Sequence, residues 1–465
     1  MTPEEFRRHG YAMVDWVASY WAELGKRRVT PDSPPGTTAA GLPAGPPEHG
    51  DGFAGLVDDL DRIIAPNLTH WQHPGFFAYF PANTSGPSVL ADLVGGGLGV
   101  QGMLWSTGPA CTEVETVVLD WLAELLDLPA RFRSSGPGGG VIQDSASSAT
   151  LVATLAALHR ASGGAWRGSG VGGRRYTVYT STQGHSSIEK AARIAGLGDG
   201  AVRLIEVDEG YAMRPAALRD AIAADVAAGA VPALVVGTVG TTSTTAVDPL
   251  DAIGAICREY GVWLHVDAAY AGSAAICPEL RWVHSGLEYA DSYCFDPHKW
   301  LLTGFDCDAF WVADRAGLVE ALNVLPEFLR NAATESGAVI DYRDWQVPLG
   351  RRFRALKLWF VLRWYGAEGL RAHIRGCVEL ADRFASWVAA DERFELVAPH
   401  PFALVCFRLR GPDGPNEELL RRINATGQAY LTHTRVGGRY VLRLAIGSPW
   451  TEERHVATVW QLVAR

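Results

Sequence analysis

Two apolar runs and the helix expected between them set the fold of this chain. The runs are Ala233-Leu234-Val235-Val236-Gly237-Thr238-Val239 and Val262-Trp263-Leu264-His265-Val266-Asp267. Both are short and rich in β-branched residues, which is typical of strands buried on both faces of a sheet. Asp248-Pro249 predicts a helix start, with the aspartate as cap, and Gly261 predicts its end. This alternation predicts a doubly wound, mostly parallel α/β sheet with functional residues at the carboxyl ends of its strands.

The composition is that of an ordinary globular protein. Of 465 residues, 48% are hydrophobic and 20% charged, which is enough for a large core and two or three folding units. A net charge of −10 argues against a nucleic-acid partner, and no apolar run reaches the roughly 18–20 residues of a membrane span. The acidic N-terminus lacks the pattern of a signal peptide. The seven cysteines form no CxxC pair, so we expect no metal site, no disulfides and a reducing cytoplasm.

The two ends of the chain differ in pattern from its middle. Residues 4–24 carry apolar side chains at helical spacing, and the Pro- and Gly-rich residues 30–52 predict an extended linker. After the middle region, helical runs are followed by β-branched runs, which predicts a small α+β domain. The expected division is a helical and extended arm at 1–80 that wraps a partner subunit, a large ligand-binding domain at 81–355 and a small domain at 356–465.

The strongest chemical signal is Asp296-Pro297-His298-Lys299-Trp300, read together with Asp267 at the end of a predicted strand. A lysine ε-amine can bond covalently to the aldehyde of pyridoxal 5′-phosphate (PLP). An aspartate carboxylate can keep the pyridine nitrogen of PLP protonated, so that the ring accepts electrons. The pair Lys299 and Asp267 therefore predicts a PLP enzyme.

A candidate phosphate site lies upstream, where Gly138–Ser148 leads into an apolar helical run. A helix N-terminus with small hydroxyl residues offers amides, hydroxyls and a positive dipole end to a phosphate, although a plain serine cap is the simpler alternative. His185, in Gly184-His185-Ser186-Ser187, has two interpretations. It either stacks on the cofactor ring or contacts a substrate carboxylate, or it has a purely structural role. Thr241 either reaches the cofactor from a strand end or belongs to a turn.

These segments and several others together resemble one family. They are Trp71-Gln72-His73-Pro74, Tyr79-Phe80-Pro81-Ala82-Asn83, Pro109-Ala110-Cys111-Thr112-Glu113, Gly184-His185-Ser186-Ser187, His265-Val266-Asp267-Ala268-Ala269-Tyr270-Ala271-Gly272, Pro297-His298-Lys299-Trp300 and Asp341-Tyr342-Arg343-Asp344-Trp345-Gln346. Spread over nearly the whole chain, they resemble group II PLP-dependent decarboxylases, and among these the aromatic L-amino acid decarboxylases. The resemblance implies the PLP-dependent transferase fold type I and a homodimer with active sites at the subunit interface.

The resemblance also implies roles for individual residues. Lys299 would hold PLP, Asp267 would pair with the pyridine nitrogen, and His185 would stack on the ring. The other cofactor contacts would be Ser145, Ala146, Ser147, Thr241, Ala269, Asp296 and His298. The apolar substrate pocket, partly donated by the partner chain, would contain Trp71, Tyr79, Phe80, Pro81, Val100, Met103 and Gly350.

Three positions depart from the family pattern. Asp296 stands where asparagine is common and Asp144 where glycine is common, so both add possible negative charge near the phosphate. Phe328 falls where decarboxylases usually carry the tyrosine of a mobile catalytic loop. That tyrosine delivers or relays a proton to Cα after CO₂ leaves, whereas phenylalanine has no proton to give. Losing a general acid typically costs about 10²–10⁴-fold in rate.

Two reactions therefore stay open. The first is decarboxylation of an aromatic L-amino acid (tryptophan, phenylalanine, tyrosine or dopa) to the arylalkylamine and CO₂, with the proton supplied by His185, Tyr79 or water. The second resembles that of the aromatic acetaldehyde synthases, which carry phenylalanine at this loop position: it consumes O₂ and yields the aldehyde, CO₂, ammonia and H₂O₂. Gly350 leaves space that in relatives accompanies acceptance of an indole ring. A non-catalytic binding protein and an aminotransferase fit the retained residues and the resemblance less well.

Overall fold

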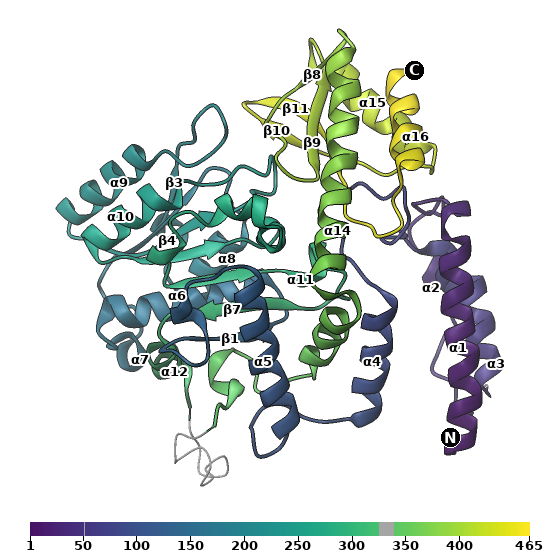
Figure 1. The fold of residues 1–465 in the computed structure, drawn as a ribbon, viewed down its shortest axis with the longest axis horizontal. Helices are drawn as coiled ribbons and strands as arrows, with labels where there is room; N and C mark the ends of the chain where they lie inside the picture. The colour runs from purple at the N-terminus through teal and green to yellow at the C-terminus, as the bar shows by residue number, and fades with distance from the viewer. Residues whose placement is uncertain (51, 325–338) are drawn as a thin grey trace.

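The computed structural model describes residues 1–50, 52–324 and 339–465, so Phe328 lies outside the described residues. The larger sheet has the order β1-β7-β6-β5-β4-β2-β3 (Figure 1). β7 runs antiparallel to its neighbours β1 and β6, and the other neighbouring pairs are parallel. The strands are β1 (Gly139–Gln143), β2 (Tyr176–Ser181), β3 (Val202–Ile205), β4 (Val231–Thr238), β5 (Trp263–Asp267), β6 (Ser292–Phe295) and β7 (Asp308–Val312). The predicted mostly parallel sheet is confirmed.

Helices cover both faces of this sheet, which explains why its strands are apolar without alternation. One face packs against α5 (Pro109–Leu125), α9 (Pro215–Ala227) and α10 (Leu250–Tyr260). The other packs against α6 (Ala146–Ser162), α8 (Ser187–Ile194) and α12 (Arg315–Leu322). The short α7 (Trp166–Ser169) follows α6. The sheet is thus the middle layer of a three-layer arrangement.

The start of α10 differs from the prediction. Gly261 ends the helix as expected, with φ of 67°, but the helix begins at Leu250 and Asp248 does not cap it. Instead, the Asp248 carboxylate accepts hydrogen bonds from the backbone amides of Met213 (2.7 Å) and Thr238 (2.8 Å). Burial raises the pKa of Asp248 to about 6. The predicted cap was wrong. The amides of Met213 and Thr238 are buried and must be hydrogen-bonded, so the Asp248 carboxylate accepts from them and not from the start of α10.

A smaller antiparallel sheet lies at the C-terminal end of the chain, as the sequence predicted. Its order is β10-β11-β9-β8, with β8 (Phe394–Leu396), β9 (Leu404–Leu409), β10 (Thr432–Val436) and β11 (Arg439–Ala445). It packs with α15 (Asp413–Ala425), α16 (Glu453–Ala464) and the long α14 (Arg354–Ala390). The helical runs predicted after the middle region form the two parts of α14. They are joined across Gly366, whose φ of 61° marks a kink. In Figure 1, α14 runs from the larger sheet to the smaller one.

The N-terminal segment stands to one side of both sheets (Figure 1). It contains α1 (Pro3–Glu23), α2 (Thr37–Gly41) and α3 (Gly52–Asp59), and α4 (Gly86–Leu98) follows. Helix α1 was predicted; all of its residues are described and none is buried. Further on, Phe77 joins the smaller sheet through backbone hydrogen bonds with Tyr430 and Ala445. Among the described residues, no helix is both long enough and apolar enough to cross a membrane.

A buried ion pair anchors α5 to the chain that follows Gly350. Arg351 Nη2 and Nη1 donate to the two Glu115 carboxylate oxygens at 2.6 and 3.1 Å. The Ile142 amide on β1 donates to the same carboxylate at 2.7 Å. The Arg351 and Glu115 side chains are only 3% and 4% exposed. Helix α5, strand β1 and the Arg351 segment are therefore held together by one carboxylate.

We expect Glu115→Ala to lower the free energy of unfolding by about 3–5 kcal/mol, because it leaves a buried guanidinium unpaired. Chemical denaturation measures this change. The matched control is Glu418→Ala, which removes the exposed pair with Arg421 and should cost no more than about 1 kcal/mol. Equal effects of the two substitutions would contradict the role given to Glu115.

Candidate active site

A cavity of about 160 Å³ lies at the carboxyl ends of the parallel strands. Asp267 is the last residue of β5, and Asp296 follows β6. The short helix α11 (Pro297–Trp300) then carries His298 and Lys299. The residues that line the cavity are Phe80, Ser145, Ala146, Ser147, His185, Thr238, Gly240, Thr242, Asp267, Ala269, Tyr270, Asp296, His298 and Lys299. The structure therefore brings together most of the residues that the sequence singled out for the cofactor.

The amine of Lys299 is held by a buried carboxylate. Lys299 Nζ lies 2.7 Å from Asp296 Oδ2, and His298 Nε2 lies 3.7 Å from the same oxygen. Burial opposes the charge on Lys299, but the carboxylates around it, Asp296 first, outweigh burial and raise the pKa of the amine. Burial likewise opposes the charge on Asp296, but Lys299 and His298 outweigh it and lower the pKa of the carboxyl. Lys299 and Asp296 are therefore an ion pair at neutral pH.

Asp267 and His185 approach the cavity from the end of β5 and from the segment after β2, with β4 between these two strands. Asp267 is 4% exposed, and its Oδ1 accepts a hydrogen bond from the Ala269 amide at 3.0 Å. His185 Nδ1 accepts from the Ser187 amide at 3.2 Å, so its neutral ring carries the proton on Nε2. Although His185 faces solvent in the single subunit, partial burial of the ring lowers the pKa of the imidazole. The site thus holds a carboxylate and a neutral imidazole with a proton to donate.

The start of α6 forms the opposite wall. Ser145 is the cap of this helix, because its Oγ accepts from the Ser148 amide at 3.4 Å, and the same hydroxyl donates to Asp144 Oδ1 at 2.8 Å. Ser145 is therefore a helix cap and a cavity residue at once. The Ala146 amide donates to Asp296 Oδ1 at 3.2 Å. Asp144 directs its carboxylate to Ser145 and is outside the cavity lining that the described residues form.

An aromatic column forms part of the cavity wall. Phe80 stacks on Tyr270 with ring centroids 3.8 Å apart, and Tyr270 stacks on Trp300 at 4.8 Å. The sequence predicted Phe80 as a pocket residue but did not single out Tyr270, which follows the strand-end aspartate by three positions. Such a stack presents apolar surface beside the Lys299 amine.

The other predicted pocket residues lie elsewhere in the single subunit. Trp71 and Tyr79 stack on each other at 5.6 Å and are 39% and 48% exposed. Pro81 is buried beside Gly447. Val100 and Met103 lie on either side of Gln101, whose Oε1 accepts a hydrogen bond from the Arg351 amide, next to Gly350, at 2.6 Å. Among the described residues of one chain, Trp71, Tyr79, Pro81, Val100, Met103 and Gly350 do not line the Lys299 cavity.

Thr241 belongs to a turn, which was the second of its two interpretations. Its hydroxyl contacts Thr244 Oγ1 and accepts from the Ala246 amide, both at 3.1 Å. Its neighbours Gly240 and Thr242 line the cavity instead. Gly240 has φ of 85°, and a Cβ there would lie 2.6 Å from Ala271 Cβ, so a glycine is required.

The sequence also missed Thr238 as a cavity residue. It lies opposite Asp267 where β4 and β5 pair. Its position at the end of the quoted apolar run was an available signal, because strand ends in such sheets meet at one edge.

The residues around the cavity fit PLP. Lys299 offers an amine for the cofactor aldehyde, and Asp267 a carboxylate for the pyridine nitrogen. His185 offers a flat neutral ring, and the start of α6 offers backbone amides and hydroxyls to a phosphate. Each part of PLP thus has a matching group within one cavity.

Comparisons with known proteins agree with this geometry. Residues 35–410 match the pyridoxal-dependent decarboxylase conserved domain. The chain is 47% identical to the aromatic-L-amino-acid decarboxylase of Rattus norvegicus over 470 residues, covering 99% of this chain and 97% of that protein. It is 45% identical to the phenylacetaldehyde synthase of Arabidopsis thaliana over 473 residues, covering 100% and 96%. The crystal structure of Oryza sativa TDC with PLP and tryptamine matches with a TM-score of 0.97 at 42% identity, covering 100% of this chain and 98% of that one. The predicted fold, cofactor and enzyme class are confirmed, and the chain belongs to the pyridoxal-dependent decarboxylase family.

Proposed function

We propose that this protein removes the α-carboxylate of an aromatic L-amino acid as CO₂ and releases the arylalkylamine. The observation that carries the proposal is the cavity itself, where the Lys299 amine and the Asp267 carboxylate lie beside an aromatic wall. An apolar aromatic wall suits an aromatic side chain, since ring stacking adds to the burial of apolar surface. The decarboxylase names of the similar proteins support the same reaction.

Each residue of the cavity has a distinct task in this proposal. PLP, when bound, supplies the electron sink for the bond that breaks at Cα. Asp267 would hold a negative charge against the pyridine nitrogen, and Lys299 would hold the cofactor in place. His185 presents a proton on Nε2, in reach of the cavity, because its Nδ1 is occupied by the Ser187 amide. Phe80 and Tyr270 keep water from one side of the cavity.

We expect the purified protein to be yellow and to release CO₂ from at least one aromatic L-amino acid. Lys299→Ala should abolish both the visible absorbance of the lysine-bound cofactor and CO₂ release, because the substituted side chain has no amine. Absorbance spectra and a CO₂ assay measure the two effects. A colourless wild-type protein that stays inactive with added PLP would rule the proposal out.

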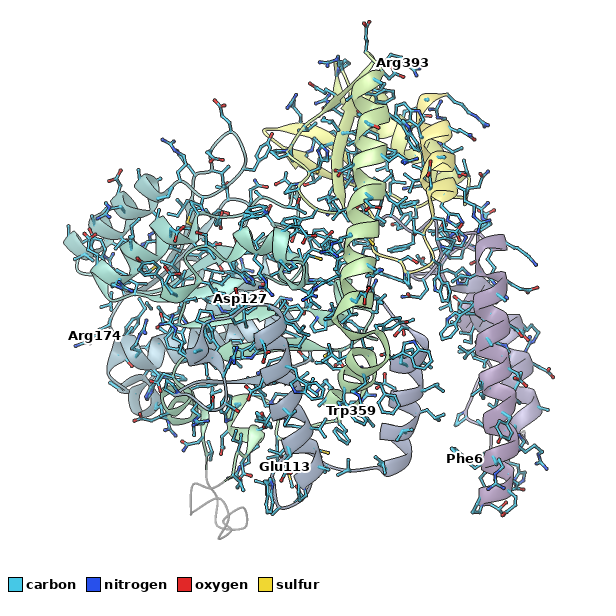
Figure 2. All side chains as sticks on the ribbon, in the orientation of Figure 1. Phe6, Glu113, Asp127, Arg174, Trp359 and Arg393 are labelled. Carbon is cyan, nitrogen blue, oxygen red and sulfur yellow. The ribbon has the colours of Figure 1, made fainter. Side chains whose placement is uncertain are left out.

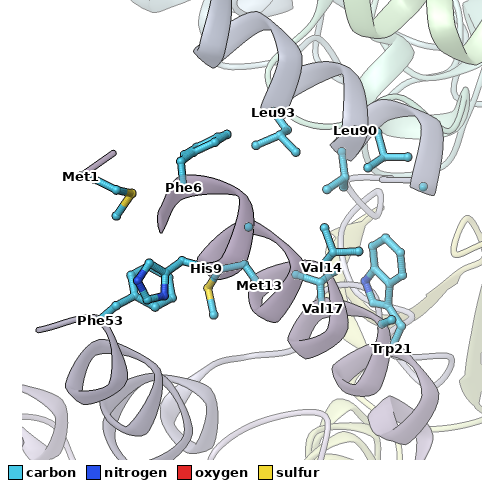
Figure 3. Close-up of a pocket in the computed structure, with 14 residues that line it drawn as sticks. Met1, Phe6, His9, Met13, Val14, Val17, Trp21, Phe53, Leu90 and Leu93 are labelled. Carbon is cyan, nitrogen blue, oxygen red and sulfur yellow. The ribbon is translucent and has the colours of Figure 1, made fainter. Parts of the chain in front are cut away.

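We also propose that the enzyme is a homodimer in which residues 1–80 reach the partner. Helices α1 and α4, with Phe53 of α3, enclose an apolar groove of about 430 Å³, and Figure 3 shows side chains of α1 and α4 facing each other across it. Its large apolar side chains include Phe6, Met13, Val17, Trp21, Leu90 and Leu93. Phe6, Leu90 and Leu93 are 56%, 48% and 49% exposed, and Figure 2 shows Phe6 on the side of α1 that faces α4.

An exposed apolar groove of this kind marks a protein interface. A second copy that covers this groove would also bring its own residues close to the active site. Val100, Met103 and Gly350 lie outside the Lys299 cavity of their own chain. We propose that they line the substrate pocket of the partner.

We expect Leu93→Asp to shift the protein toward monomers, because it buries a charge in the proposed interface. Analytical ultracentrifugation measures the shift, and activity per chain should fall with it. The control is Leu204→Asp on the edge strand β3, where a leucine of similar exposure (53%) lies outside the groove. A wild-type protein that is monomeric and fully active would contradict the proposed dimer.

A second reaction is favoured by one similar protein and one residue. The phenylacetaldehyde synthase of Arabidopsis thaliana resembles this chain almost as closely as the decarboxylase of Rattus norvegicus does. Phe328 has no hydroxyl to protonate Cα after CO₂ leaves. Oxidation by O₂, which is reduced to H₂O₂, followed by hydrolysis with one water would then yield the aromatic acetaldehyde and ammonia in place of the amine.

Product analysis with tryptophan, tyrosine, dopa and phenylalanine, with peroxide measured alongside, distinguishes the two reactions. If the oxidative route operates, Phe328→Tyr should raise the ratio of amine to aldehyde by about 10²-fold or more, because it restores a general acid. Amine formed in equal amount to CO₂, without peroxide, would exclude the oxidative route in the wild-type protein.

We further propose that the enzyme works in a reducing cytoplasm. All seven cysteines are buried free thiols. Oxidising compartments favour disulfides, whereas reducing ones keep thiols free.

A further inference from the structure

A second buried carboxyl lies directly behind Asp296. Asp308 is the first residue of β7 and is 0% exposed. β6 and β7 are antiparallel with Phe295 opposite Ala309, so the same register places Asp296 opposite Asp308. On its other side, Asp308 pairs with Gln143 of β1. Asp308 is thus enclosed between two neighbouring strands, one step away from the Lys299 ion pair.

The neighbours of Asp308 offer it no positive partner. The Gln143 amide donates to the Trp345 carbonyl oxygen at 3.0 Å, and Lys299 Nζ is already paired with Asp296. Among the described residues, no N–H or hydroxyl donor reaches either carboxylate oxygen of Asp308. An ionised carboxylate without a donor or counter-charge is costly in a protein interior. Two ionised carboxylates directly opposite on neighbouring strands would also repel each other.

One proton between the two carboxyls resolves both problems. Two ionised carboxylates can only accept hydrogen bonds, so a hydrogen bond between these opposite carboxyls requires that one of them be protonated. Asp296 has Lys299, His298 and the Ala146 amide to stabilise its charge. Asp308 has none of these contacts. The proton therefore belongs on Asp308.

The remaining titratable groups around Asp308 do not change this assignment. Asp267, on β5, adds a third carboxylate, and the positive charge of Lys299 opposes the rise in the pKa of Asp308. The thiols of Cys294 and Cys307 and the Tyr293 phenol are neutral, because burial raises the pKa of each. Burial, and then the charge of Asp296, raise the pKa of Asp308 well above its ordinary range.

We propose that Asp308 is a positioning residue that keeps its proton at neutral pH, donates it to Asp296 and so holds the Asp296 carboxylate against Lys299 Nζ. The pair then carries one negative charge, which the one charge of Lys299 balances. A second negative charge would face the start of α6, where the phosphate is expected. This role is independent of which amino acid the enzyme decarboxylates and of which product it releases.

The first test is infrared spectroscopy of the holoenzyme near neutral pH. The wild-type spectrum minus that of Asp308→Asn should contain the carbonyl stretch of an un-ionised carboxylic acid, and the band should shift in D₂O. The matched control is Asp144→Asn, which removes a nearby carboxyl outside the cavity lining and should leave the band in place. Absence of the band from the wild-type difference spectrum would overturn the proposal.

The second test is the pH dependence of unfolding. The unfolded chain loses the Asp308 proton above about pH 4, whereas the folded chain keeps it, so the stabilisation is present at low pH and is lost as pH rises through the folded pKa. Relative to Asp308→Asn, the unfolding equilibrium constant of the wild type should therefore rise about tenfold per pH unit above pH 4, until Asp308 ionises. Parallel pH dependences of the two proteins would overturn the proposal. If Asp308→Asn does not fold, Asp308→Ser, which keeps a hydroxyl donor for Asp296, replaces it as the reference variant in both tests.

Discussion

The parallel register of β4, β5 and β6 is the constraint on which the site depends. It aligns Thr238 with Asp267, and Asp267 with Cys294 two residues before Asp296. Because parallel strands end at the same edge, groups that are far apart in sequence meet there without any contribution from local pattern. Asp296 follows β6 and precedes α11, which carries Lys299 into the cavity that Asp267 also lines.

Charge is the second constraint, since the carboxyl groups at this edge of the sheet are buried from solvent. Asp267, Asp296 and Asp308 are all less than 5% exposed, and the described cavity residues supply one lysine against them. The cluster is tolerable only when the charges nearly balance, because each unpaired charge in a buried site is expensive. The imidazoles contribute little, since burial lowers the pKa of both His298 and His185. A proton on Asp308 leaves Asp296 to pair with Lys299, and Asp267 then carries the one remaining negative charge of the cluster.

Long-range packing connects this chemistry to the rest of the molecule. Helix α14 packs against α5 and also against strands of the smaller sheet, and one hydrophobic core extends across both regions. Arg443 of β11 reaches the edge of the cavity, donating to the Thr242 carbonyl oxygen at 2.7 Å beside the ring of Phe80. The smaller sheet therefore supports a wall of the site rather than standing apart from it.

Local sequence patterns were enough to predict the α/β class, the N-terminal helix and Lys299 and Asp267 as residues of one site. These follow from local signals: apolar runs at strand length, helical spacing, and residue types whose chemistry is specific to one cofactor. Most of the residues that the sequence predicted to bind the cofactor also line the cavity. The motifs that carry them lie at the ends of strands or at the starts of the helices that follow. The fold class was predictable for the same reason, since alternating helices and strands leave few stable topologies.

The positions of the remaining side chains depend on contacts that local sequence does not reveal. The Asp248 carboxylate accepts hydrogen bonds from the amides of Thr238 and Met213 and does not cap a helix. Thr241 belongs to a turn, and the register of β6 and β7 places Asp308 opposite Asp296. Strand register and burial settle each of these, and both depend on contacts between segments distant in sequence. Val100, Met103 and Gly350, which the resemblance assigns to a substrate pocket shared between subunits, lie outside the Lys299 cavity of the single chain, because local sequence does not determine contacts between distant segments.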